Sequence, residues 1–191
     1  MEVSCIALGK GAQCLVRRGF MKEKSTEELL AILDKARSHN LTHITDNIRE
    51  QPSFICNCCS CCCELMLGVQ AGYHDGVGKT PFLARIDKEV CNGCGLCVPA
   101  CNVNAITAAV AEKGSQPRAC GECTDAVCVG CGAWLPVCQR NALFLGERPV
   151  RPLPPEKRKD MFKAILWEKG RLKPYLVSGM KKKLRKIWPG C

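Results

Sequence analysis

Eighteen of the 191 residues are cysteine, and this density constrains the fold more than any other property of the sequence. Aromatic residues make up only 5% of the chain, so we expect a thin hydrophobic core that needs a second source of stability. The sequence shows no secretory signal at its start and no run of 18 apolar residues. We therefore expect a cytoplasmic protein in a reducing compartment, where clustered cysteines bind metal instead of forming disulfides.

An internal repeat with an offset of 37 residues organises the middle of the chain. Residues 91–106 align with residues 128–143, and eight of the 16 aligned positions are identical. Apolar segments at 82–87, 105–106 and 142–143 flank the two cysteine loops. This pattern predicts short strands around each loop, with each loop leading into a helical turn.

The first copy of the repeat carries a C-x2-C-x2-C-x3-C run. Its cysteines are Cys91, Cys94, Cys97 and Cys101. Thiolates at this spacing converge on the irons of one cluster when the loop is tight, and Gly93 and Gly95 allow that close approach of the backbone. Structural zinc sites usually take two separated C-x2-C pairs instead. The spacing therefore predicts iron–sulfur chemistry.

On these motifs, residues 82–146 resemble the bacterial two-[4Fe–4S] ferredoxin domain. The resemblance implies an α+β fold class: a ferredoxin-like, pseudo-twofold (β-α-β)2 iron–sulfur domain, flanked by an N-terminal helical region and a basic C-terminal helical tail. It also implies crossed sets of ligands. The first [4Fe–4S] cluster would take Cys91, Cys94, Cys97 and Cys138. The second would take Cys101, Cys128 and Cys131, and needs one more ligand.

That missing ligand is where the sequence departs from the resemblance, because Trp134 stands at its position and indole does not ligate iron. The prolines that follow the last cysteine of each run in the family are also replaced, by Asn102 and Gln139. Three alternatives stay open for the second site. Cys120 or Cys123, an extra C-x2-C pair, supplies the ligand; or the site holds a [3Fe–4S] cluster; or it is empty.

A second group of cysteines lies upstream, within residues 54–63. Its members are Cys56, Cys58, Cys59, Cys61, Cys62 and Cys63. One interpretation is a third iron–sulfur site, with Cys5 or Cys14 as further ligands; the other is that several are small buried hydrophobes and the rest unpaired thiols.

The segment resembles a group of bacterial iron–sulfur proteins with an ICNCC-x-CCC sequence before a two-cluster domain. Those chains begin further upstream, so we expect a shortened member or a misplaced start.

Five segments are predicted along the chain. They are an N-terminal helical region (1–53), the cysteine-dense segment and connector (54–81), the two-cluster domain (82–148), a proline-rich linker (149–155) and a basic tail (156–191). In the first, Ser25 and Glu28 form a capping-box pattern ahead of an apolar helix that ends at His39 and Asn40.

The tail carries the net charge of the protein. Residues 151–191 contain 13 Lys or Arg and three acidic residues, which accounts for the whole net charge of +10. Apolar residues at helical spacing predict two helices, one around Met161–Leu166 and one around Val177–Ile187. The tail is either a solvated face packed on the protein or a surface for an acidic redox protein; an anionic membrane and nucleic acid are weaker alternatives.

The sequence contains no catalytic triad, HExxH motif or pair of carboxylates that would predict a catalytic site or a small-molecule substrate. We therefore expect an electron-transfer protein or subunit that shuttles single electrons through its clusters, rather than an enzyme. The rival hypothesis is an iron–sulfur redox or oxygen sensor that signals through the basic tail.

Overall fold

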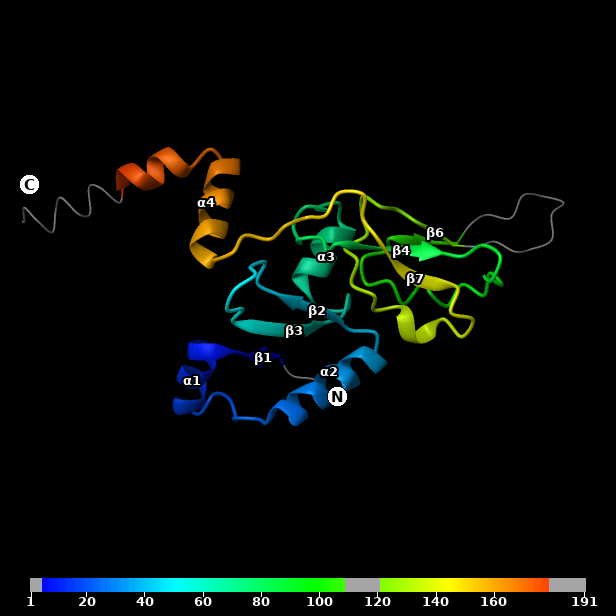
Figure 1. Ribbon diagram of the computed structural model, residues 1–191, viewed down its shortest axis with the longest axis horizontal. Coiled ribbons are helices and arrows are strands. Elements are labelled where there is room, and N and C mark those ends of the chain that lie inside the picture. The colour runs from blue at the N-terminus through cyan, green and yellow to red at the C-terminus, as the bar shows by residue number, and fades with distance from the viewer. Residues whose placement is uncertain (1–4, 109–120, 179–191) are drawn as a thin grey trace, which may run out of the picture. The chain divides into compact units, whose positions relative to one another are not determined.

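The computed structural model describes residues 5–108 and 121–178, which fall into two compact units. The first unit contains residues up to 46 and residues 53–152, and the second contains residues 47–52 and those from 153 onward. The described residues contain helices and small antiparallel sheets, which confirms the α+β class (Figure 1). Cys120 and most of the second predicted tail helix lie outside the described residues. Within them, no helix has both the length and the apolar character needed to cross a membrane.

Two helices lie in the N-terminal part of the first unit. They are α1 (Gly9–Arg17) and α2 (Thr26–Ser38). The predicted capping box is confirmed: the Ser25 hydroxyl accepts from the Glu28 N–H, and the Glu28 carboxylate accepts from the Ser25 N–H. Helix α2 ends at His39 because Asn40 takes a left-handed conformation with φ 57°.

A three-stranded antiparallel sheet shows that residues 1–53 are not helical throughout. Its strands are β1 (Ile6–Ala7), β2 (Thr42–Thr45) and β3 (Phe54–Cys58), in the order β1-β3-β2. The β-branched residues of β2 favour the extended backbone, and pairing with β3 satisfies its hydrogen bonds. Because Phe54–Cys58 is the central strand, the start of the cysteine-dense segment is a sheet element.

Helix α3 (Glu64–Gln70) follows the last of the clustered cysteines and was not predicted. Its Met66 and Val69 side chains are fully buried in the hydrophobic core of the first unit, together with Leu83 and Ile106. Helix α3 therefore packs the end of the cysteine-dense segment against the hydrophobic core around the repeat.

The strands predicted around the cysteine loops are confirmed. Strand β4 (Phe82–Ile86) pairs with β7 (Leu143–Glu147), and the two lie side by side in Figure 1. Strand β5 (Ile106–Thr107) pairs with β6 (Glu122–Cys123). The two ladders are related by the repeat, because Ile86 pairs with Leu143, and the residues offset from these two by 37, Cys123 and Ile106, also pair with each other.

The repeat is also present in the conformation of the loops. Four glycines have φ between 69° and 73°, at equivalent positions in the two copies: Gly93, Gly95, Gly130 and Gly132. Two further hydrogen bonds cross between the copies, each 2.8 Å long: the Asp87 N–H donates to the Ala142 carbonyl, and the Thr124 N–H to the Ala105 carbonyl. The predicted helical turns are short, with one 3-10 helix, η1 (Leu135–Val137), in the second copy.

The second unit joins the segment 47–52 to the start of the tail. Backbone hydrogen bonds of 3.0 and 2.9 Å run from the N–H groups of Arg49 and Glu50 to the carbonyls of Pro155 and Glu156. Helix α4 (Arg158–Glu168) contains the first apolar pattern predicted for the tail, and residues 172–178 are also helical. None of the α4 side chains is buried.

Asp46 is the last residue of the first unit before residues 47–52, and it contacts Ser53, where the first unit resumes. Its carboxylate accepts hydrogen bonds from the Ser53 N–H at 2.9 Å and from the Ser53 hydroxyl at 2.7 Å. Burial acts to raise the pKa of Asp46, but the hydrogen bonds from Ser53 outweigh it and hold the pKa below its ordinary value. The ionised carboxylate therefore stabilises the folded state.

We expect Asp46→Asn to lower the free energy of unfolding by about 1–3 kcal/mol at pH 7, because a buried hydrogen-bonding group loses its best acceptor. The folded-state pKa is depressed, so the contribution is complete above the unfolded pKa and is lost as the pH falls through the folded one. Anaerobic urea unfolding of the metal-loaded protein at several pH values measures both effects. Equal stability of the two proteins at pH 7 would contradict the prediction.

Candidate metal centres

The first candidate site brings together four cysteines from both copies of the repeat. They are Cys91, Cys94, Cys97 and Cys138. Burial raises the pKa of Cys97, and the three neighbouring thiols raise it further. All four line one cavity of about 100 Å³ beneath the loop that holds Gly93 and Gly95. The first predicted set of ligands therefore lies around a single space.

The second candidate site is formed by cysteines that are more deeply placed. It contains Cys101, Cys123, Cys128 and Cys131. Cys101 and Cys128 are 5% and 4% exposed and belong to the hydrophobic core. The Cys123 thiol hydrogen-bonds to Cys128, and pairing of β5 with β6 places Cys123 beside Ile106. A fourth thiol thus lies beside the three predicted ligands, and it comes from β6.

Cys128 is prepared to act as a thiolate. The hydrogen bond from Cys123, the backbone N–H groups of Ala84 and Gly130 and the charge of Arg148 lower the pKa of Cys128 to about 6, although burial opposes them. The same hydrogen bond raises the pKa of Cys123. Because thiolates are the form that binds metal, the lowered pKa favours Cys128 as a metal ligand.

Arg148 holds the loops around the second site together. Its guanidinium donates to the carbonyls of Thr80 and Cys128, with a longer bond of 3.5 Å to the carbonyl of Asp125. Its backbone N–H donates to Pro81 at 2.9 Å. No sequence pattern predicts this role, because the contacts are with backbone groups distant along the chain.

Trp134, which stands at the position of the missing ligand, is buried. Its side chain is 2% exposed and packs in the same hydrophobic core as Cys101 and Cys128. The residue also caps η1 at its N-terminal end. Trp134 is therefore a packing residue beside the second site.

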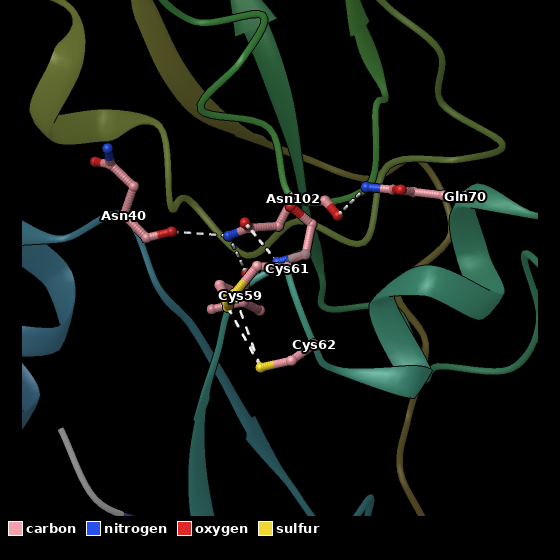
Figure 2. The surroundings of a disulfide bond; sticks show 8 residues. Asn40, Cys59, Cys61, Cys62, Gln70 and Asn102 are labelled. Carbon is pink, nitrogen blue, oxygen red and sulfur yellow. Dashed lines mark hydrogen bonds between the residues drawn. A yellow bond between two sulfur atoms is a disulfide. The ribbon is translucent and has the colours of Figure 1, made fainter. Parts of the chain in front are cut away.

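Asn102, which follows Cys101, links three segments of the first unit. Its side-chain amide donates to the Asn40 carbonyl at 2.7 Å and to the Thr42 hydroxyl at 3.0 Å, and its amide oxygen accepts from the Ser60 N–H at 3.3 Å (Figure 2). Its carbonyl accepts from the Gln70 side chain at 3.0 Å. Proline at this position would provide none of the three side-chain hydrogen bonds.

The six clustered cysteines do not point one way. Cys59 and Cys61 form a disulfide, with the Cys62 sulfur 3.8 and 3.7 Å from their sulfur atoms (Figure 2). The prediction of metal-bound cysteines without disulfides is therefore wrong for this pair in the described structure. Two other members, Cys56 and Cys58, lie on β3, and Cys63 caps α3. Cys14 lies on α1, where it is exposed, and it takes part in none of the contacts described above.

The closest grouping of sulfur atoms lies outside the first and second sites. Among the described residues, only Cys59, Cys61 and Cys62 form a group of three or more ligand atoms within 4.8 Å of one another. Two of these three sulfur atoms are joined in the disulfide.

Comparison with known families bears on the first site directly. Residues 84–107 match the family described as a 4Fe-4S binding domain, and the matched segment contains the whole C-x2-C-x2-C-x3-C run. A comparison with curated proteins found no match. The chain therefore contains a 4Fe-4S binding domain at residues 84–107, and this supports an iron–sulfur redox role.

Proposed function

We propose that this protein is an electron-transfer protein whose residues 82–148 form a two-cluster, ferredoxin-type domain. The observation that carries the proposal is the 37-residue repeat of backbone conformation, with its two crossed groups of four cysteines. Each group takes three cysteines from one copy or its flanking strand and one from the other copy. This crossing matches the arrangement of two-cluster ferredoxins.

Each proposed cluster has four thiolate ligands. The first is bound by Cys91, Cys94, Cys97 and Cys138. The second is bound by Cys101, Cys123, Cys128 and Cys131. Cys123 replaces the ligand missing at Trp134, which removes the need for a three-iron cluster or an empty site. Its place beside Cys128 supports this choice.

The clusters supply reversible one-electron chemistry, and the chain controls their surroundings. The Ala105 N–H donates to the Cys101 sulfur at 3.2 Å, and the Thr42 hydroxyl hydrogen-bonds to Cys131. Such donors stabilise negative charge on the ligands and raise the reduction potential. The Cys94 side is exposed, as is Leu96 at 48%. We therefore place electron exchange with a partner at the first cluster.

An acidic redox protein is the partner that the charge of the chain favours. The excess positive charge lies in residues 151–191, and α4 offers exposed apolar side chains, including Trp167 at 74%, beside its lysines. Attraction of opposite charges would raise the rate of encounter and weaken with salt. Stopped-flow reduction at several salt concentrations measures this attraction.

Anaerobic reconstitution with iron and sulfide tests the proposed function. We expect at least about eight iron atoms per chain, a matching amount of labile sulfide, and EPR signals of reduced [4Fe–4S] clusters that reoxidise reversibly. Stoichiometric zinc without labile sulfide would overturn the proposal, as would clusters that cannot be reduced.

The role of Cys123 is tested by replacement with serine. We expect Cys123→Ser to convert the second cluster to a three-iron form or to lose it, because the fourth thiolate is gone, while the first cluster remains. EPR of the oxidised protein detects the three-iron form, and iron analysis detects loss of about one to four atoms. Cys14→Ser, at an exposed cysteine outside both sites, is the matched control. An unchanged spectrum in Cys123→Ser would assign the ligand elsewhere.

A further inference from the structure

The cysteine-dense segment separates into two groups because β3 is extended. Side chains two residues apart on a strand point to the same face, so Cys56 and Cys58 share one face and Asn57 takes the other. Asn57 pairs with the His43 side chain at 2.7 Å. Cys59, Cys61 and Cys62 follow in the turn after the strand, where two of them are disulfide-bonded (Figure 2).

Two more cysteines meet the face of β3 that carries Cys56 and Cys58. The antiparallel register pairs Ile6 with Ile55 and Ala7 with Phe54, so its continuation sets Cys5 opposite Cys56. The Cys5 thiol hydrogen-bonds to Cys56, and the Cys63 thiol hydrogen-bonds to Cys58. Four thiols from β3, the start of β1 and the cap of α3 therefore gather at one place.

We propose that Cys5, Cys56, Cys58 and Cys63 bind a third iron–sulfur cluster. The four side chains provide the full set of thiolates that a [4Fe–4S] cluster requires. This site does not depend on the assignment of the other two.

The third site adjoins the second through one residue. Thr42 is the cross-strand partner of Cys58, and its hydroxyl hydrogen-bonds to Cys131. The same hydroxyl accepts from the Asn102 amide, and the Thr42 side chain is buried at 3% exposure. A cluster at the third site would therefore be a neighbour of the second cluster, with no solvent-filled gap at Thr42.

Iron analysis of the full chain, reconstituted anaerobically, tests the third site. We expect about twelve iron atoms in the unaltered protein and about eight in Cys58→Ser and in Cys63→Ser. The matched controls are Cys62→Ser, in the adjacent turn, and Cys14→Ser on α1; both should retain about twelve. EPR of the reduced protein should show magnetic interaction between the second and third clusters, and Cys58→Ser should remove it.

Several results would overturn the third site. About eight irons in the unaltered protein would do so and would leave the two-cluster function standing. Zinc at these cysteines, full iron retention by Cys58→Ser, or an equal loss in Cys62→Ser would also overturn it. Cys5→Ser removes the most exposed of the four thiols and is the variant that disturbs folding least, so it should also retain about eight irons. Loss of all iron in every one of these variants would refute a separate site.

Discussion

Removing iron from the anaerobic protein with a chelator is expected to unfold residues 82–108 and 121–148. Two of the buried core residues, Cys101 and Cys128, are proposed ligands, and both sheets around the repeat have only two strands. Two-stranded sheets are marginal by themselves. The free energy of metal binding then becomes free energy of folding, on the order of 10 kcal/mol for structural metal sites.

Amide hydrogen exchange measures this unfolding residue by residue. We expect protection of β4, β5, β6 and β7 to be lost with the iron and to return when iron and sulfide are added back. Protein carried through the same buffers without chelator is the control. Retention of the same protection in iron-free protein would show that the apolar core alone holds the fold, contrary to this expectation.

Truncation of Trp134 is expected to have the next largest effect. Trp134→Ala should lower the free energy of unfolding by about 3–5 kcal/mol, because the side chain is 2% exposed and leaves a cavity. Water would then reach the second cluster, and we expect it to bleach faster in air. Denaturant titration and the decay of visible absorbance measure the two effects.

Trp134→Cys distinguishes a packing role from a lost ligand. It restores the cysteine of the aligned first copy, yet we expect no gain in iron, since Cys123 already completes the site, and a loss of stability from the cavity. Trp134→Phe keeps most of the packing and should cost less. A more stable Trp134→Cys protein with additional iron would contradict the assignment of Cys123.

The features that the sequence predicts well are those that depend only on residues close together along the chain. The helix after Ser25 follows from one capping box, and the repeat follows from glycines that take positive φ at matched positions. The strands around the loops follow from short apolar runs. These features need no knowledge of distant parts of the chain.

The remaining features depend on contacts between distant residues. Strand β1 has two residues, too few for any periodicity, and only its pairing with β3 brings Cys5 to Cys56. Helix α3 spans seven residues, and only Met66 and Val69 mark its buried side. The choice of Cys123 depends on pairing of Ile106 with a strand beyond a segment outside the described residues. Spacing alone does not rank such pairings.

Asn102 makes one ligand loop a junction between parts of the chain. Its three side-chain hydrogen bonds join Asn40, Thr42 and Ser60 to the residue that follows Cys101, a proposed ligand of the second cluster. Insertion of that cluster and docking of the upstream segment should therefore occur as one cooperative step of assembly.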